Sequence, residues 1–210
     1  MSTETKCLEF KNISMEFPGV KALDDVSFSI GSGEIHALMG ANGAGKSTLI
    51  KILARVYEQT SGEILLHGES INRATAKTIR SHGIDFIFQE LELIPGVSVA
   101  QNVMVGIEPR RAGLIDWKKM TGEAQKALDD FMPGVIDARM PINQLSVAKQ
   151  QIVSIVRALH RNPKILVLDE PTSRLSSAET EALFAAIRRL RERQELTIIE
   201  RGKAYKAMLE

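Results

Sequence analysis

The chain has 210 residues, of which 44% are hydrophobic and 25% are charged, as expected of one globular domain or of a domain with a small inserted subdomain. Its 27 Lys and Arg residues balance 26 Asp and Glu residues, so we expect no nucleic-acid partner, because such proteins usually carry net basic charge. No apolar run approaches the ~18 residues of a membrane span, and no signal peptide is recognised. We therefore expect a cytoplasmic protein that reaches a membrane only through a partner.

The predicted elements alternate between strands and helices. In chain order they are strands at 7–17, 19–30 and 33–40, a helix at 45–56, strands at 61–71 and 83–90, helices at 98–107, 116–132 and 148–161, a strand at 163–171, a helix at 176–194 and a strand at 195–200. The spacing of the first helix places Leu49, Ile52, Leu53 and Val56 on one face. This order predicts an α/β fold with a mostly parallel core sheet, an antiparallel β subdomain at the N-terminus and an inserted helical subdomain at about 91–161.

A glycine-rich segment, GANGAGKST, lies between a predicted strand and a predicted helix and fits the pattern G-x-x-x-x-G-K-[ST]. Its glycines let backbone N–H groups turn toward an anion, and the following helix N-terminus adds partial positive charge. In this pattern Lys46 reaches the β- and γ-phosphates of a nucleotide and Ser47 binds Mg²⁺. The predicted nucleotide-binding residues are Gly40, Ala41, Asn42, Gly43, Ala44, Gly45, Lys46, Ser47 and Thr48.

An acidic pair follows a second apolar run, ILVLDEP, which is short enough for a buried parallel strand. Asp169 at the end of this strand would hold Mg²⁺ through water, because Mg²⁺ keeps several of its waters. Glu170 could then polarise the attacking water as a general base. A strand that merely ends in two acids is the competing interpretation, and the phosphate loop upstream argues against it.

Three further segments resemble motifs of the ATP-binding cassette (ABC) ATPases. LSVAKQQ, residues 145–151, resembles their signature motif and opens the helix before the acidic strand. FIFQE resembles their glutamine loop, and EPTSRLS, which starts at Glu170, resembles the loop after the acidic strand. The motifs follow the order of the family from about residue 9 to residue 199. On them the chain is identified as a member of the ABC ATPases.

The resemblance implies roles that spacing alone does not assign. Phe17 in MEFPGVKALDDVSF matches the aromatic residue that stacks on adenine, and Gln89 matches the glutamine that contacts the metal and couples the site to a partner. Ser146 matches the serine that binds the γ-phosphate of ATP held by an opposing domain. A second nucleotide-binding domain, in the same or a sister chain, is therefore implied.

The branch of the family is indicated by longer stretches, among them IHALMGANGAGKSTLIKIL and FQELELIPGVSVAQNV. They most resemble the N-terminal nucleotide-binding domain of bacterial ribose-, galactose- and xylose-type sugar import ATPases. The resemblance implies hydrolysis of MgATP, with Lys46, Gln89 and Glu170 as catalytic residues and with Ser47, Gln89 and Asp169 at the metal. It also implies transmembrane permease subunits as partners, an indirect link to a sugar-binding protein and a place on the inner face of the plasma membrane.

The sequence departs from the family pattern at three places. Arg174 and Ser176 stand where the family favours Ala and Asp. The switch histidine that should follow the last predicted strand is absent from RGKAYKAMLE, residues 201–210. The third departure is that the chain stops at Glu210, whereas the domains it resembles continue with further strands. The chain is expected to be a single ABC ATPase domain over residues 1–210 that is truncated at its C-terminus.

Other functions stay open at this point. Without the switch histidine, the chain could bind ATP as a hydrolysis-impaired fragment or regulatory half. A soluble ABC protein acting on nucleic acid or the ribosome would usually show long charged linkers and an LSGG signature, and the sequence has neither. A phosphate-loop kinase has no use for LSVAKQQ.

Overall fold

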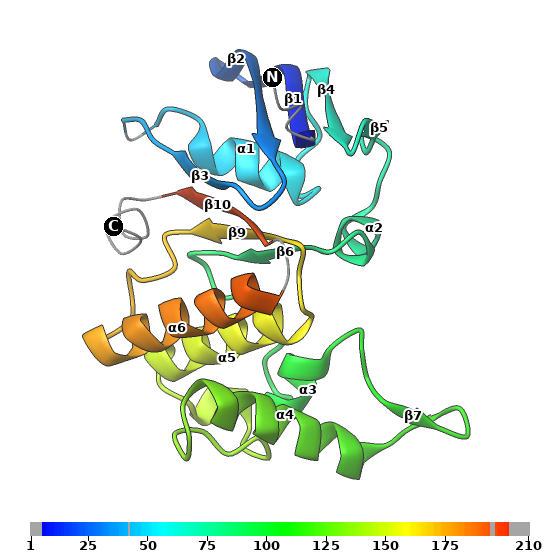
Figure 1. Ribbon diagram of the computed structural model, residues 1–210, viewed down its shortest axis with the longest axis vertical. Helices are drawn as coiled ribbons and strands as arrows, with labels where there is room; N and C mark the ends of the chain where they lie inside the picture. Colours follow the sequence, from blue (N-terminus) through cyan, green and yellow to red (C-terminus); the bar gives the residue numbers. More distant parts are fainter. Residues whose placement is uncertain (1–5, 42, 194–195, 202–210) are drawn as a thin grey trace. The chain divides into compact units, whose positions relative to one another are not determined.

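The computed structural model describes residues 6–41, 43–193 and 196–201 (Figure 1). Its chain divides into two compact units. The first comprises Met1–Phe86, Pro163–Glu170 and Arg191–Glu210, and the second comprises Ile87–Asn162 and Pro171–Leu190. The single domain over residues 1–210 and the bounds of its helical subdomain stay predictions.

An antiparallel sheet opens the first unit. Its strands are β1 (Lys6–Phe17), β2 (Val20–Gly31), β4 (Ser61–Leu66) and β5 (Glu69–Ser70), in the order β2-β1-β4-β5. The β1–β2 hairpin turns tightly at Gly19, whose φ of +81° suits glycine. The rings of Phe10 and Phe28 stack with their centroids 4.6 Å apart. The predicted antiparallel subdomain is confirmed.

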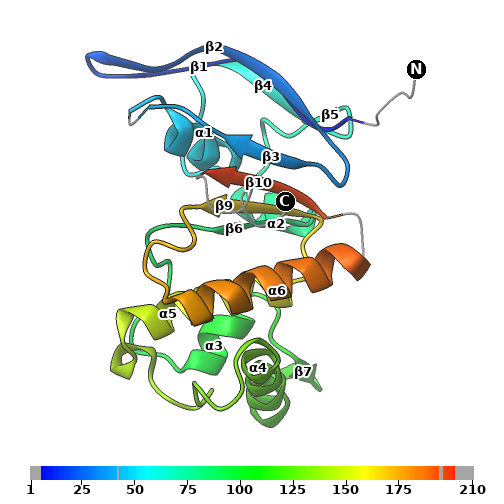
Figure 2. The same ribbon diagram turned by 60° about the vertical axis from the view of Figure 1, so that its left-hand side comes forward.

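A parallel sheet follows, with strands β3 (Ile35–Leu38), β6 (Ile84–Ile87), β9 (Ile165–Asp169) and β10 (Thr197–Arg201). Their order is β3-β10-β9-β6, and β10 runs parallel to both of its neighbours. Every residue of β9 is buried, which explains why ILVLD reads as one apolar run ending in an acid. Helix α1 (Lys46–Leu53) lies between the two sheets of this unit in both views (Figures 1 and 2). The α/β fold class is confirmed.

The second unit is mainly helical. Its helices are α3 (Val99–Met104), α4 (Trp117–Phe131), α5 (Val147–His160) and α6 (Ser177–Arg193), with a 3₁₀ turn at Ile142–Gln144 and a short hairpin of β7 (Arg110–Arg111) and β8 (Leu114–Ile115). Val103, Met120 and Ile152 are buried in one cluster of α3, α4 and α5. Helices α5 and α6 run side by side in both views (Figure 2). In the part of the chain described here, no helix has both the length and the apolar character needed to cross a membrane.

Two predicted elements differ from the structure. Helix α1 ends at Leu53 instead of 56, because Arg55 takes a positive φ of 61°, and Val56 is therefore 53% exposed instead of facing the core. The predicted strand 61–71 is a hairpin of β4 and β5, because His67 and Gly68 both have positive φ and reverse the chain. Helix α2 (Ala76–Ser81) and the β7–β8 hairpin have no counterpart in the prediction.

Candidate nucleotide-binding site

The predicted phosphate loop connects β3 to α1. Gly45 is the N-cap of α1, and no side chain caps the helix there. The first four N–H groups of a helix have no partner inside the helix, so an uncapped N-terminus is a place where an anion can bind. Ser47 and Thr48 lie in this first turn. Asn42, also predicted to bind nucleotide, lies outside the described residues.

The side chain of Lys46 folds over the loop. Its Nζ donates to the carbonyl oxygens of Gly40 and Ala41, each at 2.7 Å. The loop is closed by a bond from the N–H of Ala44 to the carbonyl oxygen of Ala41 at 3.2 Å. The ammonium group is therefore held at the loop itself, where a phosphate bound by the loop would meet it.

Gly45 has no room for a side chain. Its φ is +77°, and a Cβ atom would meet the backbone oxygen of Ala22 and lie 2.6 Å from Cδ2 of Leu23. Gly43 has a similar φ of +85°, but a Cβ atom there would meet nothing within 4 Å. The two glycines thus share a left-handed backbone and differ in steric contact.

We expect Gly45→Ala to lower the free energy of unfolding by more than Gly43→Ala does. Both changes cost roughly 1–2 kcal/mol for the left-handed backbone, and the clash with β2 should add about 1–3 kcal/mol at Gly45 alone. Urea unfolding of the two variants beside the wild type measures the difference. Equal losses would show that the loop does not pack against β2 as described.

The acidic pair lies at the carboxyl edge of the parallel sheet. Asp169 ends β9 with its side chain 7% exposed, and Glu170 follows with its side chain 39% exposed. Because β3 and β9 flank β10 in parallel, the phosphate loop and the acids leave the sheet at the same edge. Ligands of open α/β sheets bind at this edge.

Arg201 joins the two halves of the site. Its Nη1 donates to Asp169 Oδ1 at 2.8 Å and to the hydroxyl of Ser47, and its Nη2 lies 3.1 Å from Glu170 Oε1. The parallel register pairs Arg201 with Asp169 on one side and with Leu38 on the other. No sequence motif includes Arg201, and a basic residue that ends an apolar strand beside an acidic one is only a weak local signal.

The oxygen atoms near Arg201 suit a magnesium ion. Ser47 and Asp169 offer a hydroxyl and a carboxylate oxygen, which are ligands that Mg²⁺ prefers. Both oxygen atoms bond to one and the same nitrogen of Arg201, so they converge on a single point. The two predicted metal ligands of this unit therefore have the oxygen atoms that Mg²⁺ requires, and these atoms point to a common position.

Phe17 and Gln89, two further predicted site residues, belong to different units. Phe17 ends β1, and its ring meets that of Tyr57 edge-on with the centroids 5.4 Å apart. Gln89 belongs to the second unit, where it is exposed just after β6. The segment after it is fixed by Asn102, whose side chain binds the N–H and the carbonyl oxygen of Ile94 at 2.7 and 3.1 Å.

Ser146, also in the second unit, is the N-cap of α5. Its hydroxyl accepts a bond from the N–H of Lys149 at 3.4 Å, and Lys149 Nζ donates to the carbonyl oxygen of Val135 at 3.0 Å. Val147 beside it is 54% exposed. The exposed helix N-terminus thus presents the signature segment to solvent within its own unit, as an anion-binding element would.

The departure at Ser176 has a local structural reason. Its hydroxyl and its N–H both bind Oε2 of Glu179, at 2.9 and 2.8 Å, at the start of α6. Serine at this position caps the helix.

A phosphate loop between a strand and a helix, together with an acidic strand end in the same parallel sheet, defines a phosphate-loop nucleotide-binding fold. The family model described as "ABC transporter" matches residues 23–173. The chain belongs to the ABC transporter family, and the predicted family is confirmed.

Relatives and solved structures agree with this assignment. The chain is 48% identical over 185 residues to the arabinose import ATP-binding protein AraG of Chromohalobacter salexigens, covering 88% of this chain. It is 48% identical over 188 residues to the ribose import ATP-binding protein RbsA 2 of Escherichia coli O157:H7, covering 90% of this chain. It spans 37% of the length of each of these relatives. A dimeric ATP-binding cassette in a post-hydrolysis state, bound to ADP and Pi, matches with a TM-score of 0.81 at 27% identity, over 95% of this chain and 89% of that chain.

Proposed function

We propose that the chain is a nucleotide-binding domain that binds and hydrolyses ATP to power sugar import. The observation that carries this proposal is the position of Lys46 over the phosphate loop at the same sheet edge as Asp169 and Glu170. Two relatives are named as arabinose and ribose import ATP-binding proteins, and these names support a sugar as the cargo. Its transmembrane permease would hold the domain at the inner face of the plasma membrane, and a sugar-binding protein would deliver the cargo.

The residues of the first unit divide the chemistry of hydrolysis. The loop N–H groups and Lys46 bind the phosphates and stabilise the charge that develops on them. Phe17 stacks on the adenine ring. Ser47 and Asp169 would hold Mg²⁺, which neutralises phosphate charge when it is bound. Glu170 accepts a proton from the attacking water and orients it.

The second unit supplies the groups that complete the site of another domain. Ser146 and the exposed N-terminus of α5 would bind the γ-phosphate of ATP held by an opposing copy, and Gln89 would contact the metal and relay the state of the site to the permease. The dimeric state of the matching cassette with ADP and Pi supports this pairing. Each chain then contributes a phosphate loop to one site and a signature segment to the other.

Complementation between two inactive variants tests this sharing. Lys46→Ala removes the phosphate loop function of a chain, and Ser146→Arg removes its signature function. Each variant alone should release no phosphate, whereas a one-to-one mixture should regain about a quarter of the wild-type rate, because mixed pairs of a two-fold dimer keep one intact site. A mixture as inactive as its parts would refute the shared site.

The competing function is a nucleotide-binding half that does not hydrolyse ATP. It rests on the missing switch histidine in residues 201–210, of which 202–210 lie outside the described residues. Phosphate release by the wild-type chain separates the two functions, because both bind ATP and only the first turns it over.

A further inference from the structure

Arg201 places a positive charge where the site would hold its metal. The same nitrogen, Nη1, contacts the hydroxyl of Ser47 and Oδ1 of Asp169, and these are the two oxygen atoms of this unit assigned to Mg²⁺. The second terminal nitrogen lies 3.1 Å from Glu170 Oε1. One guanidinium group therefore contacts the two oxygen atoms proposed for Mg²⁺ in this unit and the carboxylate proposed as the general base.

The guanidinium is held firmly in this position. The side chain of Arg201 is 17% exposed and that of Asp169 is 7% exposed, so their ion pair is largely shielded from water. Removing one partner from a shielded pair leaves an uncompensated charge, which is costly. A cation that approaches Ser47 and Asp169 must break these charge-assisted bonds before it can bind.

The backbone fixes Arg201 there as well. Arg201 is in register with Asp169 of β9 and with Leu38 of β3, and β3 leads directly into the phosphate loop. The N–H of Glu170 also donates to the carbonyl oxygen of Arg201 at 3.2 Å. The strand register of the parallel sheet therefore fixes the position of this charge, in addition to the side-chain rotamer of Arg201.

We propose that Arg201 is a built-in cation that competes with Mg²⁺ for Ser47 and Asp169. This inference rests on the proposed nucleotide site. In the wild type, nucleotide binding then depends little on Mg²⁺, because the guanidinium already supplies positive charge beside the phosphate loop. Turnover by the wild type then requires a higher Mg²⁺ concentration than turnover by a chain without this guanidinium, because Nη1 must first leave both oxygen atoms.

The experiment measures metal binding directly, with Mn²⁺ as the probe and a non-hydrolysable ATP analogue as the nucleotide. Electron paramagnetic resonance reports the free Mn²⁺ in the wild type, Arg201→Ile and Arg201→Gln. Both variants should bind Mn²⁺ at least about 10-fold more tightly than the wild type. This is the gain in affinity expected when charge-assisted hydrogen bonds no longer oppose the metal. Two different replacements guard against a folding defect in one of them.

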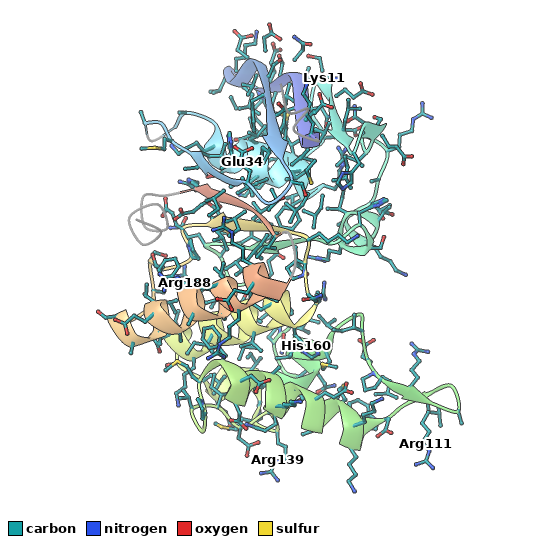
Figure 3. The ribbon with its side chains drawn as sticks, in the orientation of Figure 1. Lys11, Glu34, Arg111, Arg139, His160 and Arg188 are labelled. Carbon is teal, nitrogen blue, oxygen red and sulfur yellow. The ribbon has the colours of Figure 1, made fainter. Side chains whose placement is uncertain are left out.

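The matched control is Arg111→Ile, which removes the same charge from the exposed β7–β8 hairpin of the second unit. Arg111 lies on this hairpin and points away from the neighbouring helices (Figure 3). Its Mn²⁺ affinity should equal that of the wild type. Equal Mn²⁺ affinity in the wild type and in both Arg201 variants would overturn the proposal. Arg201 would then serve only to link β10 to β9 through its ion pair with Asp169.

Analogue affinity measured in EDTA separates this inference from the proposed function. The wild type should bind the analogue about equally with and without Mg²⁺, whereas Arg201→Ile should lose about 10-fold in affinity when the metal is removed. Binding that weakens equally in both proteins on metal removal would overturn the role of Arg201 and keep the nucleotide site. A wild type that binds no analogue under either condition would overturn the nucleotide site itself.

Discussion

Replacement of Lys46 by alanine is expected to weaken ATP binding by about 10- to 100-fold, the value of one charge-assisted hydrogen bond to a phosphate. The ammonium group of Lys46 is held over the loop by the carbonyl oxygens of Gly40 and Ala41, so its removal takes away the side-chain cation of the loop. Isothermal titration calorimetry of the wild type and the variant measures the loss.

The control is Lys77→Ala, which removes a lysine from helix α2 of the same unit. Lys77 is exposed and lies outside both the phosphate loop and α1. ATP affinity should therefore stay within about threefold of the wild type, since an exposed charge outside the loop is largely screened by salt. A similar loss in both variants would mean that Lys46 acts only through general charge.

Replacement of Glu170 by glutamine is expected to lower the rate of phosphate release by at least about 100-fold, the range of a lost general base. Glutamine keeps the size of the side chain and an oxygen atom that can accept from Arg201, so ATP affinity should stay near the wild-type value. Phosphate release under saturating MgATP and calorimetric ATP binding, measured on the same preparation, check the two parts of this result.

Glu181→Gln is the matched control for this change, because it removes an acid from an exposed position on α6. It should release phosphate at the wild-type rate. If Glu170→Gln keeps the full rate too, another group acts as the base and the assignment of Glu170 is wrong.

The phosphate loop and the acidic strand were predictable because each is a contiguous motif with a physical reason for its residues. Gly45 needs a left-handed backbone next to β2, and β9 is buried on all sides, so both leave a strong local pattern. The family was also predictable, since its motifs keep a fixed order along the chain. The roles of Phe17, Gln89 and Ser146 rest on that resemblance and stay predictions.

Features that depend on long-range pairing or on very short elements were not predictable. Arg201 meets Ser47 and Asp169 only because β10 inserts between β3 and β9 in a given register. The turn at His67 and Gly68 divides a run that otherwise alternates like one strand. Helix α1 ends early because of the backbone of Arg55, which no periodicity reports.

Hydrolysis of ATP by this chain is tested most directly by phosphate release from the purified wild-type protein at saturating ATP and Mg²⁺, with ATP binding measured on the same sample. The protein concentration must be high enough for two chains to pair. We expect ATP binding together with phosphate release well above the rate of Glu170→Gln. ATP binding with release no faster than that variant would contradict hydrolysis and identify the chain as a nucleotide-binding half.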